Sequence, residues 1–330
     1  MVAYERNTEE AFPNLAKALT AFVLYFLGRA YYSNWKDYIK PLRYSFYIVL
    51  AVTVFSYVTG VGFQEWGGVN TFTGLYFFKT DLAAALSQCL LVFLFKEKRG
   101  YTKIEVLTIG VCAIFILLAN ARIYYLVLVV FFVFAYMHQR EIKTGRIVKI
   151  SPRFIALILL SVGLLIVSMS YVATNTKLGE EYLLINLNDE GGLLSAGNTQ
   201  GRSVTWANIL MFFNNQPLIT RFFGYDLVSD ANAGGIGFNA HSLYIKLLFS
   251  LGYFGCFVFF MLVWAVIMNL NKLSDRRLFY LTIGYMLIFF VGGISYTSIE
   301  STQLSWYALF FMGLSISGTR MLSPQNHSNI

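Results

Sequence analysis

Nine long apolar runs recur along this 330-residue chain and constrain its fold more than any other feature. A helix that crosses a bilayer needs about 20 predominantly apolar residues. The composition agrees, because 57% of the residues are hydrophobic and only 13% are charged, whereas about 25% are charged in a soluble domain. We therefore expect an all-α polytopic membrane protein with about nine transmembrane helices, between eight and eleven. The runs cover residues 14–32, 44–62, 82–95, 104–119, 123–138, 154–172, 243–270, 278–296 and 304–319.

The net charge of +8 comes mainly from basic residues that lie between these runs. Short cytoplasmic loops of membrane proteins carry an excess of Lys and Arg, and this excess sets the orientation. If the nine spans alternate in direction, five basic segments fall on one side, which we predict to be cytoplasmic. The charge then reflects membrane topology and does not indicate a nucleic-acid partner. The five segments contain Lys36, Lys40 and Arg43; Lys96, Lys98, Arg99 and Lys103; Arg140, Lys143, Arg146, Lys149 and Arg153; Lys272, Arg276 and Arg277; and Arg320.

The longest polar segment, residues 173–240, falls on the opposite side of the membrane in this topology. A connection of this length is usually functional or forms a small domain. We expect an N-terminal transmembrane bundle at 1–172, an extracytoplasmic (periplasmic) loop at 173–240, and C-terminal transmembrane helices with a cytoplasmic tail at 241–330. Function should be sought first in the loop.

One amphipathic helix is expected inside this loop, at residues 203–215. Apolar side chains recur there at the spacing of one helix face. The helix should lie on the outer membrane surface or over the bundle. The stripe consists of Trp206, Ile209, Leu210 and Phe213.

Cations are scarce on the predicted outer side, where the orientation rule disfavours them. Arg122 lies in a short turn between two runs. One interpretation is that its guanidinium binds an anionic lipid substrate bidentately. The alternative is that the side chain extends toward the phosphates of membrane lipids. Arg202 stands at the first turn of the expected helix, where free N–H groups favour a phosphate; the alternative is an ordinary surface arginine. Lys79 precedes Asp81 at the head of a span, and a local ion pair is the alternative explanation.

His241 stands just outside the apolar run at 243–270, at its outer end. An imidazole exchanges a proton near neutral pH, so this position suits a reaction at the membrane interface. The alternative is a residue that begins the helix and packs against the loop. The run also contains Gly252 and Gly255, and glycine can break a helix.

Several short motifs follow one another along the chain. They are "FTGLYFFKTDLAAAL" at 72–86, "LLANARIYYL" at 117–126, "GR" at 201–202 followed by Trp206, "FGYD" at 223–226, "NAHSLYI" at 239–245 and "LGYFG" at 251–255. In this order they resemble the superfamily of bacterial O-antigen ligases and O-antigen or exopolysaccharide polymerases. The resemblance covers about residues 70–295, and the chain departs from the usual pattern at Asp81, Asn120, Ser242 and Ser250.

The resemblance implies a fold like that of the membrane-embedded glycosyltransferases of type C, in the bacterial cytoplasmic (inner) membrane. It implies transfer of a polyprenyl-diphosphate-linked oligosaccharide on the outer side. Arg122 and Arg202 would stabilise the charge of the departing diphosphate, with Lys79 as an assistant. His241 would deprotonate or orient the acceptor hydroxyl, or hydrogen-bond the diphosphate.

The same resemblance implies that Trp206 and Tyr225 stack on sugar rings, although packing of its helix is the stronger alternative for Trp206. The expected partners are the lipid-linked glycan donor, a glycan acceptor and membrane lipids, with a chain-length regulator or a flippase as further partners. The outer segments contain no DxD pair, so we expect a metal-independent reaction without a cofactor.

Three activities fit these observations. A polymerase moves a growing chain onto another repeat unit, and a ligase moves the finished chain onto a lipid A core. We favour the polymerase, because nothing in the sequence marks a lipid A site. The third activity is a flippase for the same glycan, which would predict charges along a pathway and repeat symmetry; the sequence shows only Arg29, Glu105 and Lys246 near the ends of spans, and no repeat.

Overall fold

The computed structural model describes residues 8–66, 69–76, 78–98, 100–121, 123–146, 202–225, 241–270, 272–294 and 302–320. The chain divides into two compact units. Unit 1 consists of Met1–Ser33, Arg202–Ser274 and Gly293–Ile330, and unit 2 consists of Asn34–Gly201 and Asp275–Gly292. The boundaries that the sequence predicted, at residues 172 and 240, stay a prediction.

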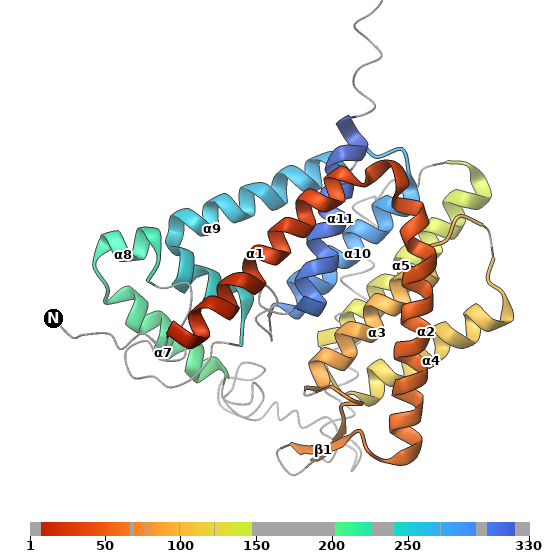
Figure 1. The fold of residues 1–330 in the computed structure, drawn as a ribbon, viewed down its shortest axis with the longest axis horizontal. Coiled ribbons are helices and arrows are strands. Elements are labelled where there is room, and N and C mark those ends of the chain that lie inside the picture. Colours follow the sequence, from red (N-terminus) through yellow and green to blue (C-terminus); the bar gives the residue numbers. More distant parts are fainter. Residues whose placement is uncertain are drawn as a thin grey trace, which may run out of the picture. The chain divides into compact units, whose positions relative to one another are not determined.

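Helices dominate the described residues, and they account for each predicted apolar run except 154–172, which lies outside those residues. Three helical stretches are long and apolar enough to cross a membrane: Tyr32–Thr59, Ile123–Thr144 and Leu243–Leu270. A mostly helical membrane protein is therefore confirmed. The helices are α1 (Thr8–Ala30), the short 3-10 helix η1 (Tyr32–Asn34), α2 (Trp35–Thr59), α3 (Lys79–Leu94), α4 (Lys103–Leu118), α5 (Ile123–Thr144), α7 (Arg202–Asn214), α8 (Leu218–Phe223), α9 (Leu243–Leu270), α10 (Arg276–Gly292) and α11 (Thr302–Arg320) (Figure 1).

A β-hairpin, which the sequence analysis did not predict, follows α2. Its strands β1 (Phe63–Trp66) and β2 (Val69–Phe72) are antiparallel, and Phe63 pairs with Phe72. The ring of Tyr57 in α2 packs against both strands, since its centroid lies 5.6 Å from that of Phe63 and 5.3 Å from that of Phe72. Cross-strand aromatic pairs stabilise short hairpins of this kind.

Unit 1 contains α1, α7, α8, α9 and α11, and two glycines let α1 and α11 lie backbone to backbone (Figure 1). A Cβ atom on Gly28 would strike the carbonyl oxygen of Phe310, and one on Gly313 would strike that of Tyr25. Small residues at such crossings are typical of helices that associate in a bilayer, because they allow close backbone approach.

Unit 2 is built around α3. Helices α2, α4, α5 and α10 all pack against α3, and its residues from Asp81 to Leu94 are buried. The contact with α10 is close, because a Cβ on Gly284 would strike the side chain of Leu91. A helix that is apolar on every side suits this central position.

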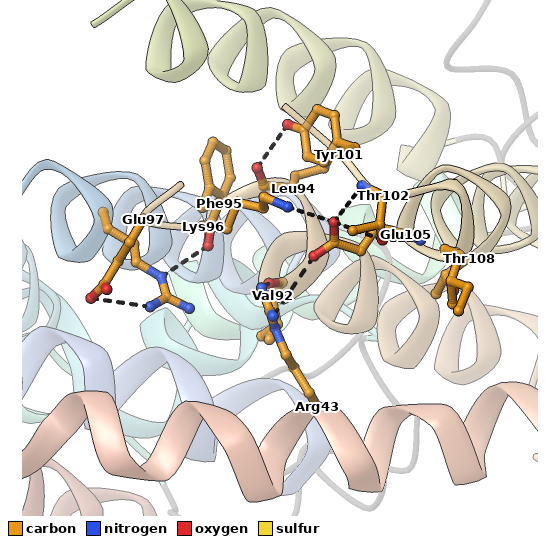
Figure 2. A network of polar contacts seen from close by, with 12 residues as sticks. Arg43, Val92, Leu94, Phe95, Lys96, Glu97, Tyr101, Thr102, Glu105 and Thr108 are labelled. Atoms are coloured by element: carbon orange, nitrogen blue, oxygen red, sulfur yellow. Dashed lines mark hydrogen bonds and ion pairs between the residues drawn. The ribbon is translucent and has the colours of Figure 1, made fainter. Parts of the chain in front are cut away.

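Because α3 is buried, the carbonyl groups at its C-terminal end need hydrogen-bond donors from other segments. The last carbonyls of a helix have no partner within it, and such groups are satisfied by other donors when they are buried. Here the donors come from α2 and from the segment after α3 (Figure 2), and also from α5 and α10. Arg43 Nη2 donates to the carbonyl of Val92 (3.3 Å), Tyr101 Oη to Leu94 (2.9 Å) and Arg277 Nε to Phe95 (3.0 Å), and His138 Nε2 lies 2.9 Å from the carbonyl oxygen of Lys96.

Glu105 balances the positive charge that this arrangement brings in. Thr102 and Glu105 form a capping box that begins α4, and the Glu105 carboxylate also accepts a hydrogen bond from Lys96 Nζ. Arg43 Nη1 lies 3.9 Å from the same carboxylate, as Figure 2 shows. One acidic side chain thus ties the end of α3 to the start of α4 and to α2.

Arg277→Met tests how far unit 2 depends on these donors. The substitution keeps a long apolar stem but removes the donor to the buried Phe95 carbonyl, so we expect a loss of about 1–3 kcal/mol of stability. Thermal unfolding of the purified chain in detergent measures the effect. Lys272→Met, at an exposed lysine, is the matched control, and equal melting temperatures for the two variants would contradict the proposed role.

Candidate functional site

Helix α7 confirms that the segment around 203–215 is helical, whereas its place in a periplasmic loop stays a prediction. Ile209 and Phe213 are buried and form a small core with Phe249 of α9. Trp206, on the same stripe, is half-buried. The apolar stripe therefore docks α7 onto α9 within unit 1.

Helix α9 breaks at Gly252, whose φ of 64° and ψ of −169° are not helical. Gly224, which follows α8, also has a positive φ, of 94°. The two glycines face each other: a Cβ on Gly252 would lie 2.5 Å from the Gly224 nitrogen, a distance that real Cβ atoms do not reach. Figure 1 shows α9 bending where it meets α8. Glycine is thus required at both positions, by backbone conformation and by space.

Tyr225 contacts α9 close to the break at Gly252. Its N–H donates to the carbonyl oxygen of Phe249 at 2.8 Å, a donor that meets the need of a carbonyl close to a helix break. The Tyr225 ring lies 5.4 Å from the ring of Phe212 and 5.3 Å from that of Phe249. The "FGYD" and "LGYFG" segments, which are separate in the sequence, therefore meet as one structural unit.

Arg202 is the first residue of α7, as the sequence predicted. Its side chain is half-buried, and burial lowers the pKa of its guanidinium from the usual value. An arginine remains charged despite such a shift. A partly desolvated cation beside the free N–H groups of a helix start is well suited to hold a phosphate oxygen.

His241 lies two residues before the first residue of α9, Leu243, and is exposed. Its φ of 45° places it in the left-handed region, which is uncommon for residues other than glycine and often occurs at functional sites. The backbone beside it is fixed, because Leu243 N–H donates to the carbonyl oxygen of Gly293 at 2.7 Å. The imidazole is therefore presented at the start of α9 on an anchored backbone.

Lys246 is a candidate that the sequence analysis did not assign to the site. It lies in the first turn of α9, and it is only 4% exposed. A lysine is rarely buried to this degree. The available signal was a charged residue inside an apolar run, which by itself marks a functional position in a membrane segment.

Two predicted site residues, Lys79 and Arg122, belong to unit 2. Lys79 begins α3 and is half-buried, whereas Arg122 lies outside the described residues. The tight turn before Arg122 is confirmed: α4 ends at Leu118 and α5 begins at Ile123. Asn120 takes a φ of 49° in this turn and accepts a hydrogen bond from Tyr125 Oη at 3.2 Å. Asparagine tolerates this left-handed conformation better than most residues.

Four predicted residues, Arg202, Trp206, Tyr225 and His241, thus belong to unit 1. Helix α7 and Tyr225 contact α9 around Phe249, and His241 lies shortly before that helix. In the described ranges, no group of three or more His, Cys, Asp or Glu side chains is arranged to hold a metal ion. The metal-independent reaction stays a prediction.

Comparisons with protein-family models, with curated proteins and with solved structures found no match to this chain.

Gly252→Ala tests the junction of α8 and α9. Gly60 provides a matched control, because its φ is 73° but nothing lies within 4 Å of a Cβ built on it. Gly60→Ala should cost only the strain of the left-handed conformation, about 1–2 kcal/mol. Gly252→Ala should cost about 1–3 kcal/mol more, because its Cβ strikes the backbone. Thermal unfolding of both variants in detergent compares them, and similar losses would mean that the contact is dispensable.

Proposed function

We propose that this chain is a polysaccharide polymerase of the bacterial inner membrane, similar to the O-antigen and exopolysaccharide polymerases. It transfers polyprenyl-diphosphate-linked oligosaccharide repeat units on the outer side of the membrane. The observation that carries the proposal is the meeting of the "FGYD" and "LGYFG" segments through Gly224 and Gly252. This contact supports the proposal because it joins two motif pieces that lie apart in the sequence into one structural element.

The proposal includes the finer topology. Nine helices span the membrane, the basic loops face the cytoplasm, and residues 173–240 form a periplasmic loop over a bundle like that of type C glycosyltransferases. The donor then keeps its polyprenyl tail in the bilayer and its sugars outside. The start of α9 suits such a substrate, since an exposed His241 lies two residues before a helix that is long and apolar enough to cross.

In the proposed reaction, the acceptor hydroxyl attacks the anomeric carbon of the donor sugar. The new C–O bond forms as the bond to the diphosphate breaks, and the diphosphate leaves on its lipid carrier. His241 takes the hydroxyl proton, a contribution of roughly 10²- to 10⁴-fold. Arg202 stabilises the negative charge on the diphosphate. The same role for Arg122 and Lys79 stays a prediction from the resemblance.

Residues with aromatic rings complete the proposed site. Trp206 and Tyr225 are half-buried, so part of each side chain is accessible to a sugar ring. Their packed neighbours hold them in place; for Tyr225 these are Phe212 and Phe249. The proposed partners are the lipid-linked donor, the glycan acceptor, membrane lipids and a chain-length regulator or flippase.

Glycan length in cells tests this function. Cells that lack the protein and receive Arg202→Ala or His241→Ala should accumulate single repeat units on the lipid carrier, because transfer falls about 100-fold or more without a charge-stabilising or proton-accepting group. The wild-type chain should restore long glycans. Electrophoresis of the lipid-linked and surface glycans, with the protein quantified in each strain, measures the distribution.

Arg140→Ala is the matched control, since Arg140 is exposed on α5. Long glycans that stay on the lipid carrier in the absence of the protein would indicate a ligase in place of a polymerase. Full rescue by both Arg202→Ala and His241→Ala would rule out the proposed site.

Lys246 gives a second test of the same site. If its charge contacts the diphosphate, Lys246→Met should lower kcat/KM about 10- to 150-fold, which corresponds to a charge-assisted hydrogen bond of about 1.5–3 kcal/mol. Lys246→Arg should retain most of the activity. Transfer by purified enzyme from a lipid-linked repeat unit measures both, with Lys272→Met as the control. Wild-type kinetics for Lys246→Met would show that the lysine has no part in the reaction.

A further inference from the structure

Helix α8 exposes most of its apolar side chains. Leu218 is 71% exposed, Ile219 70% and Phe223 61%. A soluble surface rarely displays large apolar side chains in such density, and a patch of this kind usually marks an interaction surface. Of the other three members of this six-residue helix, Phe222 is 44% exposed, and Thr220 and Arg221 are half-buried.

The α8 patch continues onto α9 within unit 1. The ring of Phe254 lies 5.8 Å from that of Phe222, in a stacked arrangement, and 6.0 Å from that of Phe223. Beyond Phe254, the exposed face of α9 remains apolar, with Phe257 63% exposed and Met261 50% exposed. The surface of α8 and the outer face of α9 are therefore one apolar surface.

The break at Gly252 determines which part of α9 crosses the membrane. The helix runs from Leu243 to Leu270, and the part beyond the break, 253–270, rises about 27 Å at 1.5 Å per residue. This length is close to the roughly 30 Å of the hydrocarbon layer. Tyr253 and Phe254 then lie at the edge of that layer, and α8 lies at the same level because it packs against Phe254.

We propose that α8 is an interfacial helix, which lies at the boundary between the acyl chains and the head groups at the Gly252 end of α9. Leu218, Ile219 and Phe223 contact the acyl chains, as apolar faces of interfacial helices do. Arg221, whose side chain is half-buried, is a residue type that suits the adjacent layer of lipid phosphates. This proposal concerns lipid contact, and it stands independently of the glycan transfer proposed above.

The bilayer is the occupant that these observations favour over a second protein surface. The α8 patch is continuous with a helix face that must itself contact lipid if α9 crosses the membrane. The break at Gly252 places Phe254 at the edge of the hydrocarbon layer, and α8 packs against Phe254 at that level. An amphipathic element with an arginine at this depth is typical of the interface, where aromatic rings and long cationic side chains are both favoured.

Depth-dependent quenching tests the proposal. Single cysteines replace Leu218, Ile219 or Phe223 in a full-length chain whose Cys89, Cys112 and Cys256 are changed to Ala, and each carries a small fluorophore. The chain is reconstituted into phosphatidylcholine–phosphatidylglycerol vesicles with bromine placed near the head group or near the middle of the acyl chain. Met261→Cys, within the spanning part of α9, is the deep reference, and Asn214→Cys, exposed at the end of α7, is the reference outside the patch.

We expect shallow bromine to quench the three α8 probes about three-fold or more above Asn214→Cys, as contact with the interface requires. Deep bromine should quench Met261→Cys more strongly than any α8 probe. Quenching of the α8 probes at the level of Asn214→Cys would overturn the proposal. In that case, reaction with a membrane-impermeant maleimide would show that water contacts α8, whereas protection would show that protein covers it. Quenching of α8 mainly by deep bromine would also overturn the assigned depth.

Discussion

Backbone carbonyls that a helix cannot satisfy by itself govern the arrangement of this protein. The C-terminal end of α3 is buried, so its carbonyls depend on donors from other elements, among them Arg43 and Arg277. The carbonyl of Phe249, close to the break in α9, likewise needs a donor from another segment, and the Tyr225 N–H donates to it. An unpaired polar group in an apolar environment costs several kcal/mol. In both units, therefore, the point where a helix ends or breaks is also the point where other segments of that unit are tied to it.

The predictable part of the fold follows from local pattern. Apolar runs predicted helices because length and hydropathy act within one segment, and the stripe around Ile209 predicted α7 for the same reason. Long-range contacts were not predictable. The basic residues of the loops were interpreted as determinants of topology, yet Arg277 also satisfies the Phe95 carbonyl from 182 residues away. The sequence likewise showed two glycines in α9 but not that Gly252 breaks it, because this depends on its contact with Gly224.

The candidate site was predictable to a similar extent. Arg202 was expected at a helix start and lies there, because the stripe that defines α7 also fixes its first turn. The positive φ of His241 and the burial of Lys246 depend on how the start of α9 packs, and a single sequence does not encode this in a local pattern. Three proposed site residues of unit 1, Arg202, His241 and Lys246, thus lie at or near the start of a helix, where conformations other than helix are allowed.

The bond between Arg277 and Phe95 has a consequence for biosynthesis. At 5–20 residues per second, a ribosome needs roughly 10 to 40 s to make the 182 residues that separate them. During this interval the end of α3 lacks its α10 donor and must rely on Tyr101, which follows it directly, and on water or chaperones. The junction of α8 and α9, by contrast, joins residues that are near neighbours in the chain and can form as soon as they emerge. The α1–α11 crossing of unit 1 forms later still, because Ser317 Oγ of α11 donates to the Arg29 carbonyl oxygen of α1, 288 residues earlier in the chain.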